Sequence, residues 1–150
     1  MNNMTETTYY TPSIEEFHVD FEYERNVSSS IEHEKWEKID DFSNAYEYED
    51  DPLYGVIKDL ENENIRVKYL DKKDIESCGF TFYHRNDKSY WGGTCFTYIK
   101  GNDVGNLFLY CIPNKNKVVI RQELEQGENQ LFDGHIKNIN ELKIILKQIQ

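Results

Sequence analysis

Between residues 80 and 123 the chain alternates short apolar segments with turn-forming residues, and this pattern is the strongest constraint on its fold. Runs of apolar and aromatic residues of this length, separated by Asn, Asp, Gly and Pro, are typical of antiparallel strands joined by tight turns. Turns are expected at 86–88 and 101–103, and 113–116 is expected to close a hairpin. The expected strands are 80–84, 95–100, 107–112 and 117–123.

A short amphipathic helix is expected directly after Pro52. Leu53, Val56, Ile57 and Leu60 recur at the spacing of one helix face, so these four residues should face the core. Asn62 and Asn64 follow and should end the helix.

Two further helices are expected in the second half of the chain. Asp71 can cap a short helix over 72–77, with Asp74 at the third position of a capping box. Near the C-terminal end of the sequence, apolar residues again recur every three or four positions. Two residues could cap this last helix, Asn138 or Asn140. The apolar positions of that helix are Leu142, Ile145, Leu146 and Ile149.

The other expected strands come before the β-rich segment. Aromatic and acidic residues alternate over 17–24, which predicts a strand with an aromatic inner face. A similar alternation predicts a strand over 65–69, and a weaker one favours a strand over 31–36; residues 126–130 are expected to be a polar loop. The sequence therefore predicts an α+β fold with a mostly antiparallel sheet of about five to seven strands, short helices and a C-terminal amphipathic helix. Its 150 residues are expected to form a single domain, 1–150.

The net charge of −11 arises in the first third of the chain. Residues 1–51 contain 15 acidic and three basic residues, a net of −12, whereas residues 52–150 contain 13 acidic and 14 basic residues, a net of +1. This distribution argues against direct binding of duplex nucleic acid, which needs clustered Lys and Arg. Aromatic residues make up 14% of the chain, which argues against intrinsic disorder.

The acidic segment has two interpretations. It can be a solvated face that keeps the protein soluble. Alternatively it mimics a polyanion and binds a basic partner. The densest acidic run, directly before Pro52, contains Glu47, Glu49, Asp50 and Asp51.

The sequence predicts a soluble cytoplasmic protein. It shows no signal peptide and no apolar run long enough to cross a membrane. Cys78, Cys95 and Cys111 are widely spaced and include no CxxC pair, so we expect packing residues rather than a disulfide framework or a zinc site.

Known catalytic motifs are absent from the sequence. It contains no dinucleotide-binding, P-loop, zinc-protease or serine-hydrolase motif. On the expected 17–24 strand, His18, Asp20 and Glu22 would share a face that could hold a hard cation, but outward acids on a strand need no metal. A Cys95–His84 nucleophile pair has no supporting feature. We therefore expect no catalytic residues, no metal and no cofactor, and a binding protein rather than an enzyme.

A ligand-binding pocket is one hypothesis, if the 65–69 and 85–93 segments are neighbours in the sheet. Guanidinium groups bind phosphate through paired hydrogen bonds, and aromatic faces stack on nucleobases. The two glycines of the second segment are expected either to form a turn or to allow close approach of a ligand. The candidate residues are Arg66, Lys68, Arg85, Lys88, Tyr90, Trp91, Gly92 and Gly93.

Three segments resemble a family of small, uncharacterised proteins from phages and prophages of Bacteroidota. The segments are IEEFHVDFEYE at 14–24, IRVKYLDKKDIES at 65–77 and the end of the chain from Gly134 to Leu146. The resemblance carries no catalytic residues. It implies a small phage protein in the host cytoplasm that modulates its host.

These observations leave three functions open. The first is an antagonist of host defence that sequesters a nucleotide-like small molecule or occludes a host defence protein. The second is an acidic decoy that binds a basic nucleic-acid-binding protein. The third is a minor structural or assembly protein of the phage. A homodimer is expected because it is the commonest soluble oligomer.

Overall fold

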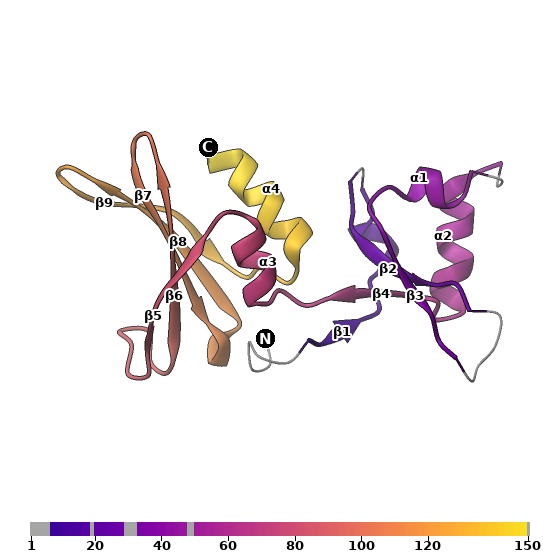
Figure 1. The fold of residues 1–150 in the computed structure, drawn as a ribbon, viewed down its shortest axis with the longest axis horizontal. Coiled ribbons are helices and arrows are strands. Elements are labelled where there is room, and N and C mark those ends of the chain that lie inside the picture. Colours follow the sequence, from indigo (N-terminus) through magenta and orange to yellow (C-terminus); the bar gives the residue numbers. More distant parts are fainter. Residues whose placement is uncertain (1–6, 19, 29–32, 48–49, 150) are drawn as a thin grey trace. The chain divides into compact units, whose positions relative to one another are not determined.

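The protein folds into two compact units, each with its own antiparallel sheet and its own core. The computed structural model describes residues 7–18, 20–28, 33–47 and 50–149. The N-terminal unit is Thr8–Tyr69, and the C-terminal unit is Leu70–Gln150 together with Met1–Thr7. Sheets combined with helices confirm the expected α+β class (Figure 1). A domain is defined by its ability to fold independently, which compactness alone does not establish. The expectation that residues 1–150 form a single domain therefore stays a prediction.

A four-stranded sheet with the strand order β1-β4-β2-β3 organises the N-terminal unit. Apolar and aromatic side chains from the sheet, the loops and helix α2 build its core. The elements are β1 (Tyr9–Tyr10), η1 (Ile14–Glu16), β2 (Tyr23–Asn26), β3 (Trp36–Ile39), α1 (Phe42–Ala45), α2 (Pro52–Glu61) and β4 (Ile65–Lys68). The buried core residues are Phe21, Tyr23, Tyr46, Val56, Ile65 and Val67.

The strand expected over 17–24 is largely wrong. A turn replaces its middle part: the backbone N–H of Phe21 donates to the carbonyl of His18 at 3.0 Å, and Asp20 adopts a φ of 67°. Asp tolerates this left-handed conformation better than most residues. Phe17 and Phe21 still meet, with ring centroids 4.8 Å apart, so the aromatic pattern marks core residues on a turn. Val19 lies outside the described residues.

In the N-terminal unit, strand β3 begins later than the alternation over 31–36 suggests. Strand β3 starts at Trp36, opposite Asn26 of β2, and residues 33–35 are irregular. Residues 31 and 32 lie outside the described part of the chain.

Helix α2 of the N-terminal unit has the expected position. The prediction of its buried face is partly wrong, because Leu53 and Ile57 are exposed.

Five strands in sequential order, β5-β6-β7-β8-β9, form the sheet of the C-terminal unit. Helices α3 and α4 lie on one face of this sheet (Figure 1), where Ile75, Leu142 and Leu146 pack against the inward residues of the strands. The elements are α3 (Lys72–Ser77), β5 (Thr81–Asn86), β6 (Cys95–Asn102), β7 (Gly105–Ile112), η2 (Pro113–Lys115), β8 (Lys117–Leu124), β9 (Gly127–Gly134) and α4 (Ile139–Ile149).

Strand β9 corrects the polar loop expected over 126–130. Leu124 pairs with Gly127, so only two residues form the turn, and β9 then runs antiparallel to β8. The strand lies at the sheet edge, where polar residues are tolerated because one side faces solvent. With β1 and β9, the described residues form nine strands in two sheets, more than the five to seven expected.

The helix caps expected in the C-terminal unit are confirmed. Asp71 and Asp74 form the reciprocal capping box of α3, with bonds of 3.0 and 3.1 Å. At α4 the side chain of Asn138 accepts from the backbone N–H of Glu141 at 3.0 Å. Of the two candidate caps, Asn138 therefore occupies the capping position.

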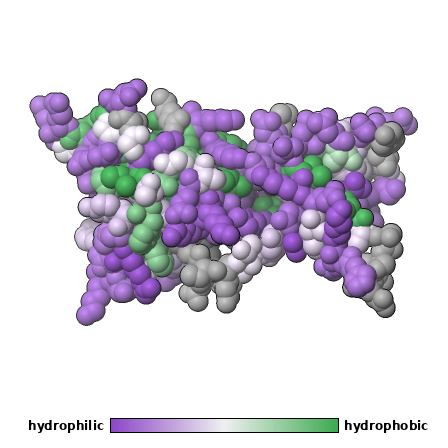
Figure 2. Space-filling model, viewed as in Figure 1, coloured by the Kyte–Doolittle hydropathy of each residue, from purple (hydrophilic) through white to green (hydrophobic). Residues whose placement is uncertain are grey.

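Most of the surface visible in Figure 2 is hydrophilic, with hydrophobic residues in small separate groups. Across the described residues, every helix is too short or too polar to cross a membrane.

Candidate functional site

The outer face of the five-stranded sheet, opposite α3 and α4, carries a strip of aromatic side chains. Side chains alternate between the two faces of a strand. In β7, Leu107 and Leu109 are buried in the helix-covered core, whereas Phe108 and Tyr110 point to the other face and are half-buried. No helix described in this unit covers that face (Figure 1).

Four rings follow one another along this face. Tyr83 of β5 meets Phe108 edge-on at 6.3 Å, and Phe108 is stacked on Tyr110 at 6.2 Å. Tyr110 in turn packs on Trp91, with ring centroids 4.9 Å apart. We call Tyr83, Phe108, Tyr110 and Trp91 the aromatic strip.

A guanidinium group lies at one end of the aromatic strip. Arg121 of β8 is paired in register with Phe108, and its guanidinium carbon lies 5.5 Å from the Trp91 ring and 5.8 Å from the Tyr110 ring. One of its nitrogens, Nη1, lies 3.1 Å from Oε2 of Glu128 on β9. The strip thus combines stacking surfaces with a cation held by an exposed carboxylate.

The end of the strip near Arg121 rests on a small apolar cluster of its own. Cys95, Ile112 and Val119 are buried there, and Trp91 and Tyr110 pack against them. Burial raises the pKa of the Tyr110 hydroxyl; Glu128 adds to this increase and Arg121 opposes it. The hydroxyl is therefore protonated at neutral pH and can donate a hydrogen bond.

Trp91 is held in place by a compact turn. The carbonyl of Gly93 accepts from both the backbone N–H and the hydroxyl of Ser89, at 3.0 and 2.8 Å. Asn114 donates its side-chain amide to the carbonyl of Gly92 at 2.9 Å. Both glycines have positive φ, 77° and 104°, which side-chain-bearing residues adopt rarely. Gly92 and Gly93 thus form the turn, the first of the two roles expected for them.

The remaining candidates of the 85–93 segment lie outside the aromatic strip. Arg85 pairs in register with Phe96, on the helix-covered face, and its Nε lies 2.6 Å from Asp87. Lys88 is exposed beside the turn. Tyr90 is 95% exposed and contacts the strip edge-on at Trp91, with ring centroids 6.1 Å apart.

Arg66 and Lys68 belong to a different sheet, so the hypothesis that they neighbour the 85–93 segment in one sheet is wrong. Arg66 lies between two rings in the N-terminal unit, 3.8 Å from that of Tyr9 and 4.1 Å from that of Trp36. Its Nε also donates to Glu24 at 2.7 Å. These contacts fix Arg66 as part of its own sheet surface; Lys68, two residues on, is half-buried opposite Tyr9 in the register.

The acidic candidates lie around the start of α2. Glu47, Asp50 and Asp51 are exposed, and Glu49 lies outside the described residues. Asp51 has a structural role, since its side chain accepts from the backbone N–H of Leu53 at 3.0 Å and caps the helix. The N-terminal unit as a whole contains 17 acidic and six basic residues, so it carries the entire net charge of −11.

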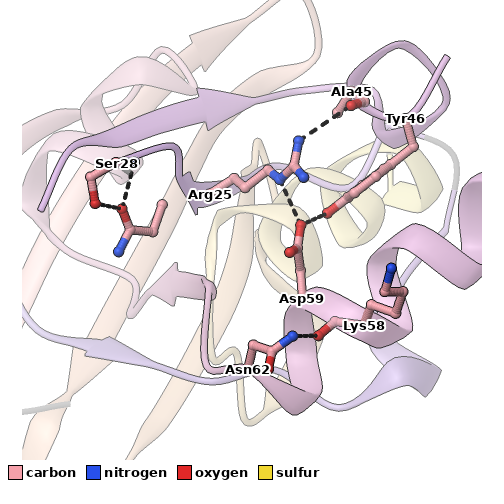
Figure 3. A network of polar contacts seen from close by, with 8 residues as sticks. Arg25, Ser28, Ala45, Tyr46, Lys58, Asp59 and Asn62 are labelled. Atoms are coloured by element: carbon pink, nitrogen blue, oxygen red, sulfur yellow. Dashed lines mark hydrogen bonds and ion pairs between the residues drawn. The ribbon is translucent and has the colours of Figure 1, made fainter. Parts of the chain in front are cut away.

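A polar network in the N-terminal unit joins α2 to β2 and to the loop after α1 (Figure 3). Oδ2 of Asp59 accepts from Nε of Arg25 and from the hydroxyl of Tyr46, each at 2.6 Å. The guanidinium of Arg25 also lies 4.5 Å from the Tyr46 ring. Burial raises the pKa of the neighbouring Tyr23 to about 12. The side chains of Arg25, Tyr46 and Asp59 satisfy one another within the fold, so we assign the network a structural role.

The geometry argues against two minor hypotheses about reactive groups. Cys95 is buried and burial raises the pKa of its thiol, which disfavours the thiolate that a nucleophile needs. The strand face that would have brought His18, Asp20 and Glu22 together does not form. Among the described residues, no cluster of three or more His, Cys, Asp or Glu side chains is arranged to hold a metal.

Sequence reasoning found Trp91 but missed Tyr83, Phe108, Tyr110 and Arg121. The signal was nevertheless present, because the 113–116 turn sets the register of the β7–β8 hairpin. With Ile112 opposite Lys117, Phe108 falls opposite Arg121 on the outer face.

Comparison of the chain with protein-family models, curated proteins and solved structures gave no match.

Proposed function

We propose that the protein is a non-enzymatic binding protein whose aromatic strip binds a flat anionic ligand of the nucleotide class. One observation carries this proposal. The guanidinium of Arg121 lies within 6 Å of the Trp91 and Tyr110 rings, on the sheet face opposite α3 and α4.

The chemistry of the strip matches the two parts of such a ligand. A nucleobase can stack on an aromatic face, which contributes about 1–3 kcal/mol per base. A phosphate can bind the guanidinium through paired hydrogen bonds. The present partner of Arg121, Glu128, is 47% exposed, and exposed ion pairs contribute little. A phosphate can therefore replace this carboxylate at low cost.

The biological role follows from the resemblance to phage proteins. A phage protein that binds nucleotide-like molecules in the host cytoplasm would remove signals that activate host defence. Occlusion of a defence protein by the same face is the other form of this role. Both make the protein an antagonist of host defence.

Thermal denaturation with a panel of cyclic dinucleotides and ADP-ribose derivatives tests this function. One member should raise the melting temperature by about 3 °C or more at a concentration about a hundredfold above its Kd. Arg121→Gln should weaken binding by about 10–100-fold. Arg85→Gln is the matched control, because Arg85 also pairs with a carboxylate near a ring but lies on the helix-covered face. Equal affinity of the two variants would contradict the proposal.

A second candidate function rests on the charge of the N-terminal unit. All of the net charge of −11 belongs to Thr8–Tyr69, and such a surface can act as a decoy for a basic nucleic-acid-binding protein. Binding of this kind should weaken steeply with salt. Neutralising Glu47 and Asp50 tests it without removing the helix cap at Asp51, and affinity that is indifferent to both charge and salt would count against it.

A further inference from the structure

Helix α2 has an apolar face that the fold leaves exposed. Of the four residues expected to face the core, Val56 is buried and Leu60 is partly buried. Leu53 is 42% exposed and Ile57 37%, and Tyr54 beside them is 55% exposed. We call Leu53, Tyr54 and Ile57 the α2 patch.

Gly55 and Asp59 explain why the helix is turned this way. Tyr46 packs directly on Gly55, so closely that a Cβ at this position would lie 2.3 Å from Cδ1 of the ring. One turn later, Asp59 accepts the Tyr46 hydroxyl at 2.6 Å (Figure 3). These two inward contacts direct Leu53 and Ile57 away from the core.

Acidic residues lie at both ends of the α2 patch. Asp50 and Asp51 come directly before the helix and are exposed. Leu53, Ile57 and Glu61 are spaced four residues apart, about one helical turn each, so Glu61 lies on the same face of α2 as the two apolar residues. Lys58 lies 5.6 Å from the Tyr54 ring and is the basic residue of this helix. The patch is thus apolar in its centre and acidic at its ends.

We propose that the α2 patch docks a basic amphipathic helix of a partner protein. Apolar residues of the partner would cover Leu53, Tyr54 and Ile57, and its Lys or Arg residues would meet the acidic ends. Charge decides between the possible occupants. A second copy would bring another unit with a net charge of −11 against the first, and anionic lipid headgroups would be repelled. This inference rests on the second candidate function and gives it a location and a partner class.

Fluorescence anisotropy with a labelled peptide tests the docking site on the full chain. The probe is a synthetic Leu-Lys peptide of about 18 residues with leucines at helical spacing, long enough to form a helix. A peptide of the same composition with Leu and Lys alternating is the first control. We expect the helical peptide to bind more tightly than the alternating one.

The decisive variant is Leu53→Ser with Ile57→Ser, which should weaken binding of the helical peptide about tenfold. Its matched control is Val104→Ser with Leu124→Ser, two exposed apolar residues of the C-terminal unit, which should leave the affinity unchanged. Circular dichroism and thermal melting establish that both variants are folded.

Three results would overturn the inference in different ways. If both peptides bind the wild type and the α2 variant equally, charge alone mediates binding: the decoy function stands and the docking site falls. If neither peptide binds, both fall. If sedimentation shows a wild-type dimer that the α2 variant converts to a monomer, the occupant is a second copy rather than a basic helix.

Discussion

Asp59 is the residue on which the polar network of the N-terminal unit depends. Its side chain is only 13% exposed, and one oxygen, Oδ2, serves both Arg25 and Tyr46. Removing a shared acceptor leaves two donors without it, whereas removing one donor leaves the other bond intact. The cost of a substitution should therefore depend on which end of the network it removes.

We predict that Asp59→Ala lowers the free energy of unfolding by about 2–3 kcal/mol and Tyr46→Phe by about 1 kcal/mol. The phenylalanine ring can still pack on Gly55, so only one hydrogen bond is lost. Urea denaturation of both variants measures the difference. Equal losses would show that Asp59 does not act as the shared acceptor.

At the scale of single elements, two misread segments show how tertiary contacts override local pattern. Residues 17–24 alternate like a strand, yet a turn at Asp20 brings Phe17 and Phe21 to the same core. Residues 126–130 are polar like a loop, yet pairing with β8 makes them an edge strand. Alternation reports which residues are buried, and it cannot report the backbone path that buries them.

Helix α2 shows the same limit in another form. Its length and its start at Pro52 follow from sequence, because capping and spacing are local properties. Its orientation depends on Gly55 and Asp59 meeting Tyr46, and this contact is not visible in the hydrophobic pattern. The α2 patch could therefore be found only in the structure.

The β6–β7 and β8–β9 hairpins offer a test at this scale, because each has a glycine of positive φ at its turn and the two glycines differ in their surroundings. Gly105 has a φ of 145°, and a Cβ there would lie 2.2 Å from the carbonyl oxygen of Glu123. Gly127 has a φ of 133° with no atom within 4 Å of that position. We predict that Gly127→Ala costs about 1 kcal/mol of stability from backbone strain alone.

Gly105→Ala should cost at least about 2 kcal/mol more than Gly127→Ala, because the main chain of β8 must also move. Thermal or urea denaturation of the matched pair measures the difference. Similar stabilities would mean that the hairpin adapts to the added methyl group and that the close approach of Gly105 to Glu123 is not a packing constraint.

At the scale of the whole molecule, charge divides with the structural units. The sequence places the change in charge at Pro52, but the boundary between the units lies after Tyr69, and α2 and β4 belong to the acidic unit. Counted by unit, the N-terminal unit carries −11 and the C-terminal unit is neutral, with 11 acidic and 11 basic residues. An anionic ligand is therefore compatible with the C-terminal unit, which carries the aromatic strip.

The candidate site was predictable in part. The sequence indicates that Trp91 and the glycines after it are unusual, and the β7–β8 hairpin register could have added Phe108 and Arg121. The pairing of Arg66 with the 85–93 segment could not be judged, because it depends on which strands share a sheet. Strand order is a long-range property that periodicity does not encode.

The central claim is that the aromatic strip binds a nucleotide-like ligand, and fluorescence of Trp91 tests it most directly. The chain has two tryptophans, so Trp36→Phe leaves Trp91 as the sole indole reporter. Titration of this variant with the ligand selected by thermal denaturation should quench Trp91 saturably as the base stacks on the strip. Adding Arg121→Gln should shift the titration to about 10–100-fold higher ligand concentration, and adding Arg85→Gln should not. Fluorescence that the ligand leaves unchanged, or quenching that is the same with and without Arg121, would contradict the account.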